Sequence, residues 1–222
     1  MISAASLTVA FGRTIALDGV DLDVAAGITG LFGPNGSGKS TLLRVIAGLQ
    51  RPTSGSVAVE GQPPSLRDES FRRRIGYSGH AAGLYSRLTV AENLELFAGL
   101  YGAPAARVDD ALAAVGLSGR ASTYAGDLSA GLKRRASVAR AIVHDPDVLL
   151  LDEPYANLDD DASEMLSTAV KEWCAPGKVA LIATHGAKKV KAYADGGIIL
   201  RDGRVVVAGR YGPRKRSTVR RS

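Results

Sequence analysis

The residues best suited to chemistry form one short run, residues 33–41. They read Gly-Pro-Asn-Gly-Ser-Gly-Lys-Ser-Thr, which fits the phosphate-binding pattern G-x-x-x-x-G-K-S. Glycines let the backbone fold around an anion, and successive N–H groups with a following helix N-terminus attract phosphate. We predict that Lys39 reaches the β- and γ-phosphates of a nucleotide and that the Ser40 hydroxyl ligates Mg²⁺. The predicted binding residues are Gly33, Pro34, Asn35, Gly36, Ser37, Gly38, Lys39, Ser40 and Thr41.

Three further polar residues come directly after apolar runs. Asp152 and Glu153 follow residues 148–151, and His185 follows the run over 179–183. We predict that Asp152 holds Mg²⁺ across from the loop serine and that Glu153 is the general base for an attacking water. His185 could donate to phosphate oxygens. The alternatives are a strand end that simply reaches solvent and a structural histidine.

Ser129 and Gly131 form a second anion-binding pattern. They lie in the run Leu-Ser-Ala-Gly-Leu, residues 128–132, which opens a predicted helix over 131–143. Serine and glycine at a helix N-terminus suit an anion. A helical insertion should hold this turn away from the phosphate loop of its own chain, which suggests that it serves the nucleotide of another subunit. An ordinary helix cap is the alternative.

An α/β core must bring these residues together. The predicted elements are strands over 28–32, 148–151, 179–183 and 198–200, with a helix over 41–47. The strand over 148–151 is fully apolar, as expected of a parallel sheet covered on both faces. Ligands of such sheets bind beyond the carboxyl ends of the strands. The phosphate loop, the acidic pair and His185 should therefore meet at one edge.

Two segments are added to this core. Alternating apolar residues over 7–24 predict two antiparallel strands, a flap with Phe11 at its tip. An aromatic ring there could stack on a base or pack in the core. Residues 84–144 are helical, and a capping box at Thr89 and Glu92 opens the first of three helices. We therefore expect a helical subdomain over 84–144, inserted in a core of residues 1–83 and 145–210.

The composition and charge of the chain limit the class of protein to which it can belong. The chain has 222 residues, of which 45% are hydrophobic, and it shows neither an apolar run of membrane-spanning length nor an N-terminal leader pattern. Its single cysteine, Cys174, excludes an internal disulfide. Five of the charges behind the net +6 lie in residues 211–222, which leaves +1 for the rest. We expect this basic tail to be disordered, either solvated or in contact with anionic lipid or nucleic acid.

The order of these motifs over residues 1–210 resembles the nucleotide-binding domain of ABC transporters. The resemblance rests on Walker A at 33–41, Walker B with its catalytic glutamate at 148–153, a signature like LSGGQ at 128–132, a D-loop at 156–159, the switch histidine at His185 and the adenine-stacking aromatic at Phe11. It implies a P-loop NTPase (RecA-like) α/β fold with a mostly parallel sheet, an antiparallel β flap and an inserted helical subdomain.

The resemblance also implies a function. The chain would bind ATP and Mg²⁺ and would form a head-to-tail homodimer, or a heterodimer with a similar ATPase subunit. Each nucleotide would then lie between the Walker residues of one copy and Ser129 and Gly131 of the other. Transmembrane permease subunits would be its partners, at the cytoplasmic face of the cell membrane, and no specific nucleic acid is expected.

Three positions depart from the family pattern. Ala130 stands for a glycine and Leu132 for the usual glutamine of the signature, and His80 stands where the family usually has the Q-loop glutamine. We expect His80 to take over the contact with water or Mg²⁺-bound water. Gly79 and His80, together with residues 88–94, are similar to the haem-exporter ATPase subunits of cytochrome c maturation. This similarity suggests export of haem or another small substrate.

Two other classes of P-loop protein are alternatives. A soluble ABC ATPase acting on ribosomes or DNA usually has tandem domains or long coiled-coil insertions, whereas this chain has one motif set and an insertion of about sixty residues. A P-loop kinase fits the phosphate loop, but Pro154 after the acidic pair and the Ser129 motif argue against it.

Overall fold

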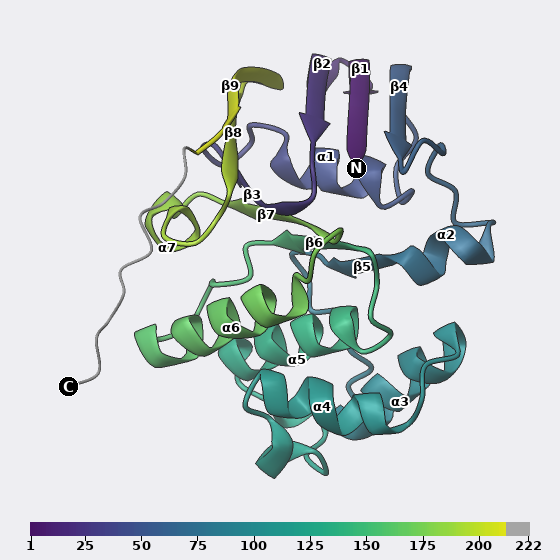
Figure 1. The fold of residues 1–222 in the computed structure, drawn as a ribbon, viewed down its shortest axis with the longest axis vertical. Helices are drawn as coiled ribbons and strands as arrows, with labels where there is room; N and C mark the ends of the chain where they lie inside the picture. The colour runs from purple at the N-terminus through teal and green to yellow at the C-terminus, as the bar shows by residue number, and fades with distance from the viewer. Residues whose placement is uncertain (212–222) are drawn as a thin grey trace.

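The computed structural model describes residues 1–211, so the predicted tail after Tyr211 lies outside the described residues. A six-stranded sheet forms its middle layer, in the order β5-β6-β7-β3-β8-β9 (Figure 1). All neighbours are parallel except β9, which runs antiparallel to β8. The strands are β3 (Gly27–Phe32), β5 (Ile75–Ser78), β6 (Val148–Asp152), β7 (Val179–Thr184), β8 (Gly196–Arg201) and β9 (Arg204–Arg210).

A three-stranded antiparallel sheet, ordered β2-β1-β4, lies at the top of Figure 1. Its strands are β1 (Ile2–Phe11), β2 (Thr14–Val24) and β4 (Ser54–Val59). Gly12 and Arg13 form the turn between β1 and β2, so the predicted flap is confirmed. Alternating apolar residues also predict a strand over 56–60, and it joins this flap as β4.

The helices cover both faces of the middle sheet (Figure 1). Helix α1 lies between the two sheets, and α5 and α6 lie below the middle sheet with α3 and α4 beneath them. The helices are α1 (Lys39–Ile46), α2 (Glu69–Arg74), α3 (Val90–Tyr101), α4 (Ala106–Ala114), α5 (Ala130–Ile142), α6 (Asp160–Trp173) and α7 (Ala187–Lys191), with 3₁₀ turns η1 (Ser118–Arg120) and η2 (Ala125–Asp127). No helix among residues 1–211 is both long and apolar enough to cross a membrane.

The middle sheet separates two hydrophobic cores. Successive side chains of a strand point to opposite faces, and β6 shows the result. Leu150 packs in the core with α1 and the flap, whereas Leu149 and Leu151 pack in the core with the helices below. All five β6 residues are buried. This two-sided burial explains why the run is apolar without alternation.

The sequence-based elements are confirmed with shifted ends. Helix α1 begins at Lys39 rather than at 41. A short helix that the sequence predicts over 188–194 is α7, which ends at Lys191. The early end of α7 lets Asp195 return to the middle sheet, where its carboxylate accepts a hydrogen bond from the Ile28 N–H at 2.8 Å. The predicted α/β fold, with its flap and its helical stretch between β5 and β6, agrees with this architecture.

Candidate functional site

The phosphate loop connects β3 to α1 and leaves the start of α1 free for an anion. The N-cap residue Gly38 has φ 100° and no side chain to cap the helix. A Cβ at this position would lie 2.4 Å from the Ala16 carbonyl oxygen, so only glycine fits. By contrast, side chains cap α2, α3, α5 and α6. The first N–H groups of a helix lack partners within the helix, so those of α1 suit phosphate oxygens.

Lys39 lies in the first turn of α1 and is 6% exposed. Its Nζ donates to the carbonyl oxygens of Gly33 at 2.8 Å and Pro34 at 2.9 Å. Burial lowers the pKa of Lys39, whereas the negative charges of Glu153 and Asp152 raise it. A positive charge is thus held at the phosphate loop with carbonyl partners, and a phosphate oxygen could replace either of them.

Asp152, the last residue of β6, has the properties of a cation ligand. Its side chain is 1% exposed, and its Oδ2 has no hydrogen-bond partner. A buried, unpaired carboxylate oxygen is costly unless a cation or ordered water receives it. The described residues hold no cluster of three or more histidine, cysteine or acidic side chains that could bind a metal. Mg²⁺ often binds through one or two carboxylates and substrate phosphates, so Asp152 and Ser40 fit this ion.

Glu153 is held by the end of the neighbouring strand β7. Its Oε1 accepts from the His185 N–H at 2.8 Å and lies 2.9 Å from His185 Nδ1. Its Oε2 accepts from the Thr184 hydroxyl at 3.0 Å. The φ of Glu153 is 50°, in the left-handed region that is strained for a glutamate. The carboxylate therefore has a fixed orientation, as a general base requires.

A hollow of about 360 Å³ brings most of the predicted residues together. It opens at the carboxyl ends of β3, β5, β6 and β7, where α/β proteins bind ligands. Its lining consists of Ala16, Asn35, Gly36, Gly38, Lys39, Ser40, Thr41, His80, Asp152, Glu153, Ala156 and His185. The hollow thus joins an anion cradle, a candidate cation ligand and a candidate base.

Six predicted residues lie outside this lining, namely the loop residues Gly33, Pro34 and Ser37 and the more distant Phe11, Ser129 and Gly131. Phe11 is 49% exposed at the tip of the flap. Ser129 is exposed and caps α5, since its Oγ accepts from the Leu132 N–H at 3.3 Å. A Cβ on Gly131 would come within 2.7 Å of the Asn157 carbonyl oxygen. Ser129 therefore caps a helix and Gly131 allows close packing within their own chain, and neither lines the hollow at the phosphate loop of that chain.

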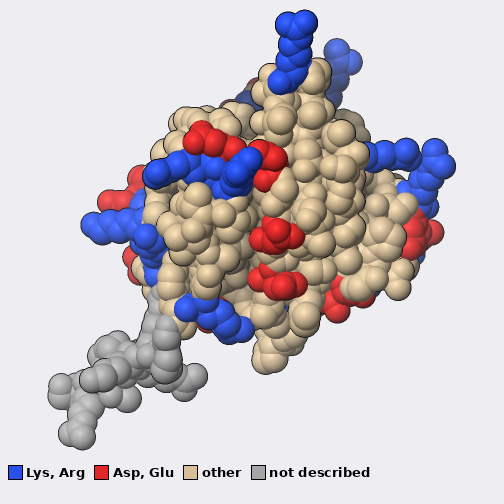
Figure 2. Space-filling view, turned by 90° about the horizontal axis from the view of Figure 1, so that it is seen from above, with Lys and Arg blue, Asp and Glu red and all other residues tan. Residues whose placement is uncertain are grey.

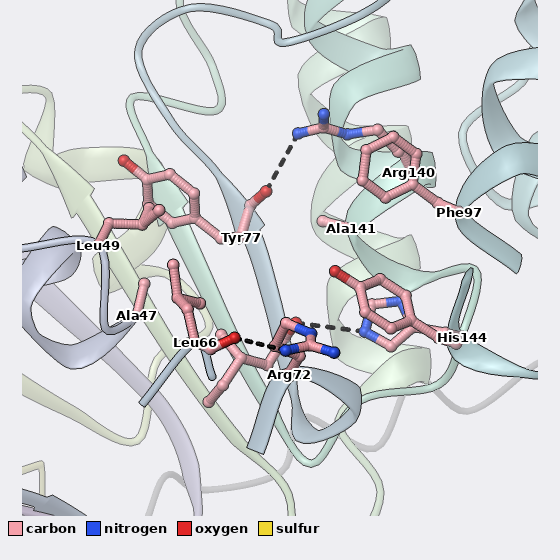
Figure 3. A pocket seen from close by; sticks show the side chains of 11 residues that line it. Ala47, Leu49, Leu66, Arg72, Tyr77, Phe97, Arg140, Ala141 and His144 are labelled. Atoms are coloured by element: carbon pink, nitrogen blue, oxygen red, sulfur yellow. Dashed lines mark hydrogen bonds between the residues drawn. The ribbon is translucent and has the colours of Figure 1, made fainter. Parts of the chain in front are cut away.

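A second, mostly apolar hollow of about 210 Å³ lies between the core and the helical stretch (Figure 3). Leu49 and Leu66 come from the core side, and Phe97 and Tyr101 from α3. Leu49 is 49% exposed and Leu66 is 41% exposed, so this hollow presents apolar side chains to solvent.

Sequence reasoning missed two residues at the site. Thr184 holds Glu153, and Arg134 on α5 donates to the main chain of Gly79 and His80. Thr184 stands directly before His185, so its place at the strand end was available from the sequence. Arg134 lies in a basic run that a surface helix would also contain, and only the packing of α5 against β5 distinguishes it.

The comparisons with known proteins agree with this geometry. Residues 17–156, more than half of the chain, match the family model described as ABC transporter. The chain belongs to the ABC transporter family. It is an ATP-binding ATPase subunit of this family, as are its relatives. One is the Nod factor export ATP-binding protein I of Burkholderia lata, which is 36% identical over 90% of this chain and 67% of its own. Another is the methionine import ATP-binding protein MetN of Brucella abortus, at 39% identity over 90% and 57%.

Solved structures of ATP-binding cassettes share the fold of this ABC ATPase. A dimeric ATP-binding cassette in a post-hydrolysis state, bound to ADP and Pi, superposes with a TM-score of 0.86 at 28% identity, covering 95% of this chain and 98% of the other. The cbiO1 protein of Clostridium perfringens, part of the transporter complex cbiONQ, gives 0.80 at 30% identity, covering 94% and 88%. The curated MetN relative is longer, since this chain spans 57% of its length.

Proposed function

We propose that this ABC ATPase hydrolyses ATP in the hollow beyond β3, β6 and β7, with Glu153 as the general base. Lys39 and the loop N–H groups would bind the phosphates. Asp152 and Ser40 would hold Mg²⁺, which supplies charge neutralisation at the phosphates. His185 and His80 would donate hydrogen bonds at the rim. The main support for this proposal is that Lys39 lines the same hollow as Asp152 and Glu153, although it lies more than a hundred residues before them in the sequence.

The site would be completed by a second ABC ATPase subunit. Ser129 and Gly131 do not line the hollow of their own chain, and α5 presents Ser129 to solvent. A head-to-tail dimer, with either an identical or a similar subunit, would bring this turn to the nucleotide of its neighbour. Phe11, exposed at the flap, would stack on the adenine. The dimeric cassette bound to ADP and Pi supports this arrangement by analogy.

A transmembrane permease subunit would dock in the apolar hollow of Figure 3. The hollow lies where the core meets the helical stretch, and it adjoins Tyr77 at the start of the segment that carries His80. An amphipathic helix of the permease could bury Leu49 and Leu66 there. The ATPase subunit would then lie at the cytoplasmic face of the membrane as a peripheral component.

The transported substrate would be a small molecule, with haem export as the specific proposal. It rests on Gly79 and His80 and on the residues 88–94 that follow. The named relatives serve Nod factor export and methionine import, so the two directions of transport both occur among similar chains. Purification from native membranes, with identification of the co-purified membrane subunit, tests this proposal.

A soluble ABC ATPase acting on ribosomes or DNA is the second candidate. Figure 2 shows the molecule from above, with acidic side chains near the centre and most lysines and arginines toward the rim. No continuous basic patch covers this face of residues 1–211, whereas a nucleic-acid footprint needs one. Co-purification with ribosomes instead of membrane proteins would favour this second function.

The decisive test replaces the base. Glu153→Gln should lower the rate of phosphate release by roughly 100- to 10,000-fold, the usual contribution of a general base, while ATP affinity stays unchanged. The variant should accumulate as an ATP-bound dimer on gel filtration. Glu164→Gln, on the exposed side of α6, is the matched control and should hydrolyse ATP like the wild type. Hydrolysis within tenfold of wild type would remove Glu153 from the proposed role.

A further inference from the structure

One helix holds the main chain of the segment that carries His80. We call residues 77–83 the His80 segment. Arg134, in the second turn of α5, donates from Nη1 to the Gly79 carbonyl oxygen and from Nη2 to that of His80, both at 2.7 Å. A longer contact of 3.4 Å joins Nη1 to the carbonyl oxygen of Asp152. Arg134 thus bridges α5, the His80 segment and the end of β6.

Two more residues of α5 extend this contact. Ser137 Oγ lies 2.8 Å from Ser78 Oγ, and both serines are buried. Arg140 donates to the Tyr77 carbonyl oxygen at 3.3 Å and also to that of Gly83, with its guanidinium 4.6 Å above the Phe97 ring (Figure 3). The His80 segment is therefore held at both ends by Arg140, and between these ends by the Ser78–Ser137 pair and by Arg134.

Arg134 is the member of this set closest to the candidate ATPase chemistry. It is 7% exposed, and no carboxylate among the described residues forms an ion pair with it. Burial lowers the pKa of Arg134, while the charges of Asp152 and Glu153 raise it. A buried guanidinium is costly unless its donors are satisfied. Carbonyl oxygens accept from both terminal nitrogens here, so moving the His80 segment would leave this buried cation with only the 3.4 Å contact to Asp152.

We propose that Arg134 is a positioning residue for the ATPase reaction. Arg134 places His80 at the hollow and makes the His80 segment move together with residues 128–132 at the start of α5. This inference rests on the proposed function. The contact between Arg134 and the His80 segment is made through main-chain oxygens, so this contact does not depend on the side chain at position 80. In a head-to-tail dimer, a nucleotide bound against Ser129 of one chain would thereby affect His80 of that same chain.

The guanidinium is required by the geometry. Its two terminal nitrogens reach two successive carbonyl oxygens at equal distances, a fork that the single ammonium of lysine cannot reproduce. Methionine would fill the space without a donor. Displacing a catalytic group by about 1 Å can cost about 100-fold in rate. Nucleotide binding should change little, because no contact joins Arg134 to the phosphate loop.

The test measures kcat and KM for ATP in Arg134→Lys and Arg134→Met. We expect kcat to fall about tenfold in the lysine variant and roughly 100-fold in the methionine variant, with KM within about twofold of wild type. Arg135→Lys is the matched control, because Arg135 is the next residue of α5 and donates to the carbonyl oxygens of Val115 and Gly116, away from the hollow. It should keep the wild-type kcat. Equilibrium ATP binding shows that each variant is folded.

A double-mutant cycle with His80→Ala tests whether Arg134 acts through His80. If it does, Arg134→Lys should lower kcat by less than about twofold in the His80→Ala background, since the group it positions is absent. Independent, multiplicative losses would overturn the inference, as would wild-type kcat in both Arg134 variants. Failure of the proposed function would look different, because Glu153→Gln would then hydrolyse ATP like the wild type.

Discussion

Thr184→Val tests how the candidate base is held. Thr184 is 3% exposed, and its hydroxyl donates to Glu153 Oε2 at 3.0 Å while it accepts from the Gly186 N–H at 3.0 Å. Valine has the same shape but neither donates nor accepts. Glu153 would keep its contacts with His185 at 2.8 and 2.9 Å and lose the third.

The size of the effect follows from these bonds. A hydrogen bond to a charged group contributes about 1.5–3 kcal/mol, and a bond between neutral groups about 0.5–1.5 kcal/mol. The carboxylate faces the hollow, where water can replace the hydroxyl, so we expect the free energy of unfolding to fall by about 1–3 kcal/mol. For the rate, weaker orientation worth about 1.4 kcal/mol corresponds to a tenfold lower kcat. The KM for ATP should stay within about twofold of wild type, because the phosphate loop is intact.

Steady-state phosphate release and thermal unfolding measure both quantities. Thr184→Ser is the matched control, since it keeps the hydroxyl and removes only the methyl group. It should retain most of the wild-type kcat. Equal losses in the serine and valine variants would show that keeping the hydroxyl does not preserve the rate, and would refute the reasoning. A wild-type kcat in Thr184→Val would show that His185 alone orients Glu153.

Other predictions concern binding, pH and the C-terminal tail. Lys39→Ala should weaken ATP binding by several kcal/mol, as an order of magnitude for a desolvated charge contact, and unchanged affinity in an equilibrium titration would contradict the phosphate-loop assignment. His80→Gln should keep substantial ATPase activity, because an amide also forms hydrogen bonds to water, whereas His80→Ala should lose activity or coupling to the permease. Burial lowers the pKa of His144 to about 4, so its neutral form is favoured by folding. The contribution of His144 to the free energy of unfolding should therefore be fully present above about pH 6.5 and fall by up to about 3 kcal/mol as the pH drops to 4. His144→Gln should lack this dependence on pH, which thermal unfolding at several pH values measures. Deleting residues 211–222 should leave ATPase activity intact, and it should reduce sedimentation with anionic vesicles at low salt if the tail binds lipid.

The fold was predictable because its strongest signals are local. The apolar runs of β6 and β7 and the capping box at Thr89 follow from residue type and spacing alone. The ends of α1 and α7 were less predictable. Lys39 joins α1 because Gly38 supplies the left-handed N-cap, and α7 stops early because Asp195 is needed at Ile28.

The candidate site was predictable where polar residues stand at the end of an apolar strand, as do Asp152 and Glu153 after β6 and His185 after β7. These roles, and those of Phe11 and Ser129, stay predictions. Thr184 and Arg134 were not found, because their functions arise only from contacts between elements far apart in the sequence. Helical spacing could place Arg134, Ser137 and Arg140 on similar sides of α5. It could not say that β5 and the segment after it pack against that side.

The resting contacts determine what ATP binding must change. Lys39 is bonded to Gly33 and Pro34, and Glu153 to Thr184 and His185. Because these groups already have partners, nucleotide binding exchanges hydrogen bonds and gains only the difference between them. Asp152 is the exception, since its Oδ2 has no partner, so a cation there would relieve a cost instead of replacing a bond. Removing Mg²⁺ should therefore weaken ATP binding strongly in the wild type and only slightly in Asp152→Asn, which a titration with and without a chelator measures.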